Sequence, residues 1–302
     1  MDRCSFIHLL PPGLILILVF CLVISVPEIH TQSMNWDYFS IGGTSNIHRE
    51  NDILYGVSNG IIKSIDNGKT WTKIFSSYNF NYLTIDKTGN FYAIDENQNY
   101  SDRIVKSTDK GITWQEILPY SSYIPFIEVD SLNSIWAGVG NILYHSSNSG
   151  STWVTKTFST QCRAIAFYGS KAILNTDDLY LSSDYGNNWS VIVTNQEFRA
   201  IRFDKNGSIY CARDYYYTPG VLIRSVNNGI SWDTLLNTNT YGLYFHGDSI
   251  YAVTGSPYTS GDIYISTISD TNWKLCGGFS DGVTSMEFIG PYILVGSTHG
   301  YY

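Results

Sequence analysis

The segment SIDNGKTW, residues 64–71, decides the fold because related eight-residue segments return along the chain. We call each of these segments a box, since serine opens it and tryptophan ends it. The other boxes are STDKGITW (107–114), SSNSGSTW (146–153), SSDYGNNW (182–189), SVNNGISW (225–232) and the divergent STISDTNW (266–273). Catalytic residues are rarely copied six times within one domain, so the boxes predict a repeated structural unit rather than an active site.

The spacing of the boxes predicts the architecture. When Trp36 is counted with them, the box tryptophans lie 35 to 43 residues apart, the period at which four-stranded blades stack into a β-propeller. The third repeat divides clearly into the strands IPFIEVD, SIWAGVG, NILYHSS and TWVTKTF between residues 124 and 158. We label the four strands A to D from the centre of the propeller outward. Each box then forms the turn between strands C and D.

Each kind of box residue has a predicted structural role. The short Asp or Asn side chain accepts hydrogen bonds from turn amides. The glycine allows a positive φ where the chain reverses. The tryptophan buries apolar surface against the neighbouring repeat. The residues assigned to these roles are Asp66, Gly68, Trp71, Asp109, Gly111, Trp114, Asn148, Gly150, Trp153, Asp184, Gly186, Trp189, Asn227, Gly229, Trp232 and Trp273.

The pattern S-x-D-x-G-x-T-W resembles the Asp-box, or BNR, repeat. This repeat occurs in sialidases, xyloglucanase-type glycoside hydrolases, sortilin-like ectodomains and photosystem II assembly factors. The resemblance covers residues 34–302 and implies an Asp-box β-propeller over that range. It does not decide the function, because these relatives include both hydrolases and binding proteins.

We therefore predict an all-β fold, a seven-bladed β-propeller of four-stranded antiparallel blades. After the sixth box, residues 283–302 repeat the pattern of an A strand and a B strand, and NWDYFS (35–40) fits an outer D strand. The last blade is then either incomplete or closed by the N-terminal strand, which removes open sheet edges. No segment stands out as its C strand.

The N-terminus predicts export. Arg3 precedes the apolar run LILILVFCLVISV (14–26), so residues 1–33 have the character of a signal peptide or of an uncleaved membrane anchor. Both alternatives place the protein outside the cell or in the cell envelope. The membrane is a partner only through this segment if it is uncleaved.

Composition and motifs exclude several functions. The net charge of -8 and the lack of Lys and Arg clusters argue against nucleic-acid binding. No phosphate-binding glycine loop, zinc spacing or nucleophile motif is present, so we expect no cofactor and no metal. We also expect the protein to be a monomer. Beyond residue 33 the cysteines are Cys162, Cys211 and Cys276, which we interpret as isolated thiols, with a Cys162–Cys211 disulfide left open.

Two groups of residues are candidates for ligand binding. The D-to-A and B-to-C loops share one face of a propeller and are rich in tyrosine here, most of all in RDYYYTPG. In addition, aligned A strands place charged residues toward a central channel, where arginines could bind an anion or pair with Glu128, Glu287 or backbone carbonyls. The candidate ligand-binding residues are Arg163, Arg199, Arg202, Glu128, Tyr241, Tyr215, Tyr216 and Tyr217.

These features lead to two functional hypotheses. The first is an exported, non-enzymatic propeller scaffold for protein or glycan recognition. The alternative is a glycoside hydrolase, sialidase-like or xyloglucanase-like, or a truncated relative of one. The repeated Asp86, Asp130 and Asp204 do not supply the carboxylate pair of a glycosidase, because their position predicts A-to-B turns. No catalytic residues are assigned, and we lean toward the first hypothesis.

Overall fold

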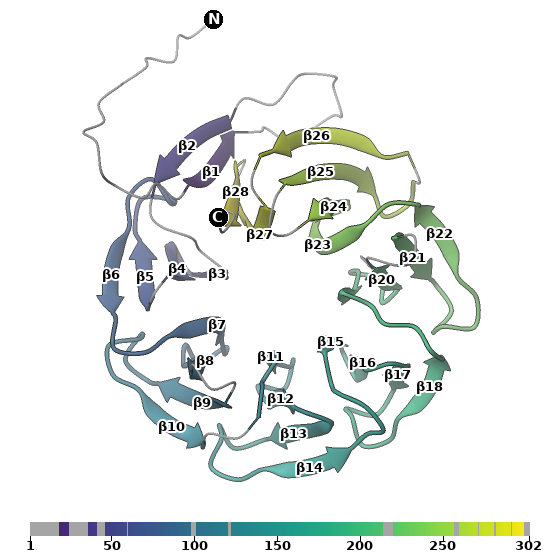
Figure 1. The fold of residues 1–302 in the computed structure, drawn as a ribbon, viewed down its shortest axis with the longest axis horizontal. Coiled ribbons are helices and arrows are strands. Elements are labelled where there is room, and N and C mark those ends of the chain that lie inside the picture. Colours follow the sequence, from purple (N-terminus) through teal and green to yellow (C-terminus); the bar gives the residue numbers. More distant parts are fainter. Residues whose placement is uncertain are drawn as a thin grey trace, which may run out of the picture.

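The computed structural model describes residues 18–23, 36–40, 46–58, 60–97, 101–119, 122–213, 220–256, 260–270, 272–280, 282–290 and 292–298. Every secondary-structure element assigned in this part of the chain is a β-strand. The strands form four-stranded antiparallel sheets that are arranged around a common centre (Figure 1). None of the residues in these ranges forms a helix with the length and apolarity needed to span a membrane. The predicted all-β propeller of four-stranded antiparallel blades is confirmed.

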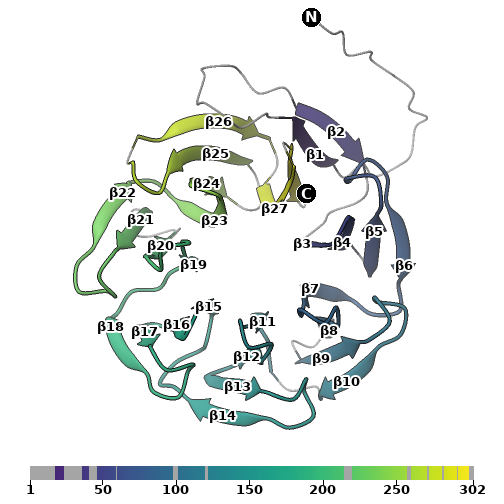
Figure 2. The same ribbon diagram turned by 180° about the vertical axis from the view of Figure 1, so that it is seen from behind.

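Six blades are each built from four consecutive strands, with the first strand innermost and the fourth outermost (Figures 1 and 2). The first three of these blades contain β3 (Ile47–Glu50), β4 (Ile53–Val57), β5 (Ile61–Ser64) and β6 (Thr72–Phe75); β7 (Phe80–Ile85), β8 (Phe91–Asn97), β9 (Ser101–Ser107) and β10 (Gln115–Leu118); and β11 (Phe126–Val129), β12 (Ile135–Val139), β13 (Ile142–Ser146) and β14 (Val154–Thr157). The next three contain β15 (Ala164–Tyr168), β16 (Lys171–Asn175), β17 (Leu179–Ser182) and β18 (Ser190–Val193); β19 (Ala200–Phe203), β20 (Ile209–Arg213), β21 (Val221–Ser225) and β22 (Asp233–Leu236); and β23 (Thr240–His246), β24 (Ser249–Ser256), β25 (Ser260–Thr267) and β26 (Lys274–Phe279). We number these blades 1 to 6 in chain order.

The remaining sheet joins the two ends of the chain. It runs in the order β2 (Trp36–Ser40), β1 (Leu18–Val23), β28 (Tyr292–Thr298) and β27 (Gly282–Ile289). The outer strand from NWDYFS lies at the predicted edge. The third position, for which no segment was predicted, is taken by β1, which pairs with β28 and comes from the apolar run assigned to export. A closed seven-bladed ring remains a prediction.

Apolar clusters lie between neighbouring blades and hold them together. Six of these clusters combine residues of two successive sheets with the box tryptophan of the second one. For example, Ile61 of blade 1 and Phe91 of blade 2 share a cluster against which Trp114 packs. The tryptophans that pack in this way are Trp71, Trp114, Trp153, Trp189, Trp232 and Trp273. The half-buried indoles therefore pack between successive sheets.

The first five boxes share the hydrogen bonds of the opening serine with the acid or Asn and with the glycine amide. In the first box the Ser64 hydroxyl accepts a hydrogen bond from the Gly68 amide at 2.8 Å and donates one to Asp66 at 2.8 Å. The second Asp66 oxygen accepts from the Thr70 hydroxyl at 2.6 Å. The indole nitrogen of Trp71 donates to the Gly68 carbonyl at 2.9 Å. These contacts close the turn between strands C and D, which explains why the pattern returns in each repeat.

A second set of aspartates closes the A-to-B turns. In blade 3, one oxygen of Asp130 accepts hydrogen bonds from the amides of Leu132 and Ser134, at 2.8 and 2.9 Å. The other accepts from the indole nitrogen of Trp136 at 2.9 Å. Asp86 and Asp204 accept hydrogen bonds in the same way from turn amides and from a tyrosine on the B strand. Their structural role is confirmed.

Candidate functional site

The first candidate site is a cavity of about 520 Å³ at the centre of the propeller, which we call the central channel. It is lined by residues of all seven innermost strands, β3, β7, β11, β15, β19, β23 and β27. Its ionisable lining residues are His48, Tyr82, Glu128, Arg202, Tyr244 and Glu287. A polar interior of this kind is typical of a ligand-binding or water-filled channel.

Glu128 and Arg202 face the same channel from blades 3 and 5. The Glu128 carboxylate accepts a hydrogen bond from the Tyr82 hydroxyl at 2.7 Å. Burial raises the pKa of Glu128, and this effect is opposed by the positive charge of Arg202 and by the Tyr82 hydrogen bond. Arg202 itself donates to the Ile201 carbonyl at 2.9 Å. The channel therefore holds a carboxylate whose charge is only partly compensated.

Glu287 and His48 line the same channel from β27 and β3. Burial raises the pKa of Glu287 to about 7, although the charge of Arg49 and the backbone amide of Phe288 oppose the shift. Burial lowers the pKa of His48 to about 4, opposed by a hydrogen bond to the Leu83 backbone. His48 is thus neutral near pH 7, while Glu287 changes charge there.

The structure does not bring the three predicted arginines into one cavity. Arg202 alone lines the central channel. Arg163 forms ion pairs with Asp177 at 2.7 Å and with Glu197 at 2.9 Å, and Arg199 is exposed on the loop before β19. The pairing partners of Arg163 are these loop carboxylates rather than Glu128 or Glu287.

The aromatic loop face is only partly within the described residues. Tyr215, Tyr216 and Tyr217 lie outside them, so their predicted role stays a prediction. Tyr241 is half-buried, and its hydroxyl accepts a hydrogen bond from the Val283 amide at 3.1 Å, which ties blade 6 to β27. Tyr123 exposes 44% of its surface. Of the described aromatic residues of this face, Tyr123 is thus exposed for contact, whereas Tyr241 has a structural role.

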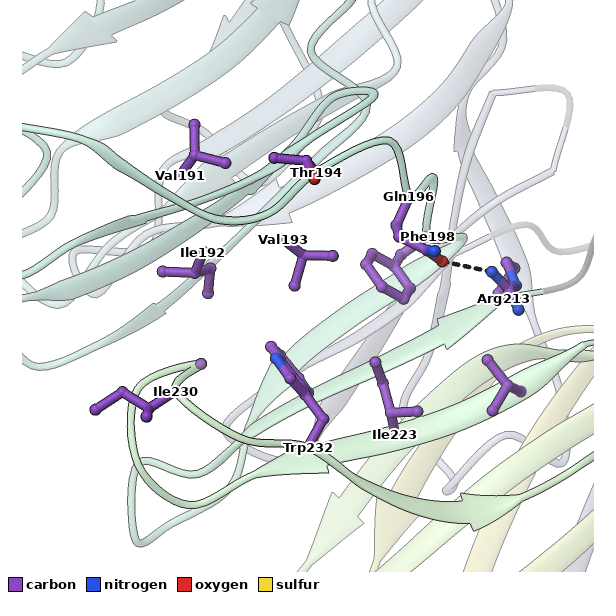
Figure 3. Close-up of a pocket in the computed structure, with 12 residues that line it drawn as sticks. Val191, Ile192, Val193, Thr194, Gln196, Phe198, Arg213, Ile223, Ile230 and Trp232 are labelled. Carbon is purple, nitrogen blue, oxygen red and sulfur yellow. Dashed lines mark hydrogen bonds between the residues drawn. The ribbon is translucent and has the colours of Figure 1, made fainter.

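The second candidate site is an open groove of about 640 Å³ between blades 4 and 5, which we call the 4–5 groove (Figure 3). One wall is β18 with the residues that follow it, and the other is β21 with the fifth box. Figure 3 shows Val193 and Ile192 opposite Ile223 and Trp232. At the far end, the Arg213 side chain donates a hydrogen bond to Gln196. The groove is therefore apolar along its length and polar at the end nearest the loop face.

Exposed apolar side chains continue the 4–5 groove onto the surface. Ile230 in the fifth box lines the groove and is 85% exposed. Val191 on the opposite wall is 44% exposed. Large apolar residues at one place on a surface, next to a groove, are typical of a protein-binding site.

Sequence reasoning missed His48, Tyr82 and Ser285 as channel residues. Alignment of the A strands placed Thr84 in the channel column, but Thr84 is buried and Tyr82 lines the channel instead. Extending the alignment to IHRE (47–50) of the first repeat would have found His48.

The described residues contain no cluster of three or more His, Cys, Asp or Glu side chains that could bind a metal ion. The three cysteines in these ranges are free thiols, as interpreted from their spacing, and burial raises the pKa of Cys162 to about 12. A thiol with such a pKa stays protonated near neutral pH and is a poor nucleophile.

Comparison with known proteins identifies the fold. No protein-family model and no curated protein sequence matches the chain. Among solved structures it is similar to YCF48 bound to D1 peptide, with a TM-score of 0.63 and 14% identity over 85% of this chain and 94% of that one. YCF48 from Cyanidioschyzon merolae gives 0.63 and 15% identity over 85% and 93%. An ancestral GH74 enzyme gives 0.60 and 17% identity over 80% of this chain but only 38% of the enzyme.

The architecture and these neighbours define the class of fold: the chain is a β-propeller, and its fold is similar to those of YCF48 and the GH74 enzyme. Of the neighbours compared above, both YCF48 structures match over nearly their whole length. At such low identities the similarity concerns the fold alone.

Proposed function

We propose that this chain is a non-enzymatic propeller scaffold that recognises an extended, apolar segment of a partner protein. The 4–5 groove carries the proposal, because apolar side chains line it along β18 and β21 and continue to the exposed Ile230 and Val191. β18, which forms one wall, is the terminal strand of its sheet. A terminal strand offers main-chain donors and acceptors to an extended peptide. The YCF48 neighbour bound to D1 peptide supports a protein partner.

Selection from a library of displayed peptides tests this proposal. We expect apolar peptides to be enriched by the chain, with affinities measured by fluorescence anisotropy. Ile230→Glu introduces a charge at the groove rim and should weaken these peptides by about tenfold or more, since burying an unpaired charge is costly. Because Ile230 is exposed, the variant should keep the melting temperature of the parent.

The matched control is Ile112→Glu. Ile112 occupies the same box position in blade 2 and is also exposed, but it does not line the 4–5 groove. Equal weakening by both substitutions, or no enrichment of peptides at all, would contradict the proposed site. A glycan array in parallel covers glycan recognition, and Tyr215→Ala, Tyr216→Ala and Tyr217→Ala test the loop assignment on either ligand.

Glycoside hydrolysis is not favoured as the alternative. The chain covers only 38% of the GH74 enzyme to which it is similar. The repeated aspartates accept hydrogen bonds within their turns instead of facing the channel. Turnover of fluorogenic glycosides that is lost on Arg202→Ala would favour the hydrolase hypothesis.

We propose in addition that the protein is exported by its N-terminal segment. The apolar run 14–26 after Arg3 supports this proposal. The same run contains β1, so an N-terminus after residue 33 would leave the sheet of β27 and β28 without this strand. N-terminal sequencing of the protein from the culture medium and from the membrane fraction separates cleavage from anchoring, and retention in the cytoplasm would contradict both.

A further inference from the structure

We propose that the central channel is a binding site for a protonated amine, with Glu287 as its counter-ion. This site is separate from the 4–5 groove and does not depend on the partner proposed for it.

Two buried polar atoms of the channel wall have no hydrogen-bond partner among the described residues. They are the hydroxyl oxygen of Ser285, a residue that is 6% exposed, and Nε2 of His48. Buried polar atoms of folded proteins are nearly always hydrogen-bonded, so each of these atoms is expected to bond to a polar group in the channel. Since neutral His48 uses its other ring nitrogen toward the Leu83 backbone, Nε2 is left as an acceptor.

When both of its carboxylates are ionised, the channel carries more negative than positive charge. Its two carboxylates, Glu128 and Glu287, outnumber its single guanidinium, Arg202. That guanidinium already donates to the carbonyl of Ile201. A ligand with one positive charge and several N–H donors would therefore match both the net charge and the acceptors of the wall. An ammonium group has these properties, and within the described part of the chain no side-chain cluster suited to a metal ion competes with it.

Binding should release a proton and strengthen as the pH rises. With the pKa of Glu287 at about 7, its ionised fraction increases about tenfold between pH 6 and pH 8. An alkylamine stays protonated over this range, so its affinity should rise by about the same factor. The charged or titratable groups around Glu287, in the channel and on neighbouring strands, are His48, Arg49, Tyr82, Glu128, Arg202, Tyr244 and His246.

Met286 provides a specific reporter, because it lines the channel and the chain contains only 3 methionines. We would label the methionine methyl groups with ¹³C in the full chain and titrate n-butylammonium chloride, following the signals by NMR. The expected result is a saturable shift of the Met286 signal, about tenfold tighter at pH 8 than at pH 6. Titration of a pentapeptide with one central lysine distinguishes a protein-borne amine from a free one.

Glu287→Gln should weaken n-butylammonium by about tenfold or more, because it removes one counter-ion but keeps the size of the side chain. Glu116→Gln is the control, since Glu116 pairs with Arg103 on blade 2 and does not line the channel. A Met286 shift with sodium acetate instead of the amine would overturn the proposal. So would an equal affinity of the parent and Glu287→Gln, or the absence of any shift at pH 8.

Discussion

Single residues explain how closely the blades approach one another, and the box glycines are the clearest case. Gly186 has a φ of 79° and belongs to the fourth box. A Cβ atom on it would lie 2.4 Å from the ring of Trp136 in the preceding blade. The glycine is therefore needed twice, for the turn conformation and for contact between blades.

Replacement of Gly186 by alanine should destabilise the protein by about 2–4 kcal/mol, the sum of positive-φ strain and overpacking. Gly169→Ala is the matched control, because Gly169 has a φ of 57° but no atom within 4 Å of the added Cβ. It should cost only about 1 kcal/mol. Urea unfolding measures both values, and equal losses would show that contact between blades does not matter here.

The half-buried Glu287 makes stability depend on pH. Its pKa is raised in the folded protein, from 4.5 to about 7, so the folded state binds its proton more tightly than the unfolded state. The stability contribution is therefore fully present below about pH 4.5 and is lost as the pH rises through 7. We expect Glu287→Gln to melt above the parent at pH 8, with the difference disappearing near pH 5. A difference that does not change with pH would contradict the raised pKa.

At the scale of elements, the hairpin between strands C and D is the repeated unit, and blade 6 shows what happens when its pattern is lost. In STISDTNW, Ile268 replaces the acid and Asp270 replaces the glycine. Within the described residues the buried indole nitrogen of Trp273 has no hydrogen-bond partner, whereas that of Trp71 donates to Gly68. The divergent hairpin thus lacks the indole hydrogen bond that the first box makes.

Restoring the pattern should stabilise blade 6. The double variant Ile268→Asp with Asp270→Gly introduces the acceptor for the turn amides and the turn glycine, at the loss of the Asp270 hydrogen bonds to Asn272. We expect a net gain of about 1 kcal/mol, the typical worth of a hydrogen bond. Thermal unfolding measures it, and Asp270→Gly alone serves as the control that lacks the new acceptor. A melting temperature at or below that of the parent would contradict this account of the box.

The whole molecule depends on how the two ends of the chain meet. The hairpin of β27 and β28 packs on blade 6 through one apolar cluster and on blade 1 through another. In the second cluster the buried Leu294 contacts the position of Gly68 in the first box. This hairpin therefore lies where a seventh blade is expected, between the first and the last of the other six (Figure 2).

If the ring is closed and cooperative, Leu294→Ala should be as destabilising as the same change inside the ring. Leu174→Ala in the cluster between blades 3 and 4 is the matched control, since both leucines are fully buried. Each should cost about 2–5 kcal/mol in a single unfolding transition. A smaller effect of Leu294→Ala, or a separate early transition, would indicate an open ring whose end blades fray.

The sequence by itself determined the blade, because the residues of each turn interact within a few positions of one another. The Ser, Asp, Gly and Trp of a box hydrogen-bond over two to four residues. Such local contacts produce a pattern that can be recognised in the sequence. Six evenly spaced copies of this pattern indicate a repeat architecture. On the A strands, Glu128, Arg202 and Glu287 were foreseen in the channel. Arg163 and Arg199 were grouped with them but do not line it, and Tyr82, His48 and Ser285 were missed.

Only the tertiary structure decided what the blades enclose and expose. Glu128, Arg202 and Glu287 share a cavity although they come from three sheets, and the Tyr82 hydroxyl reaches Glu128 from a fourth. The 4–5 groove needs two blades side by side, and Arg163 finds its partners on neighbouring loops. These are contacts between residues far apart in the chain, and they depend on strand register and blade packing, which residue spacing alone does not specify.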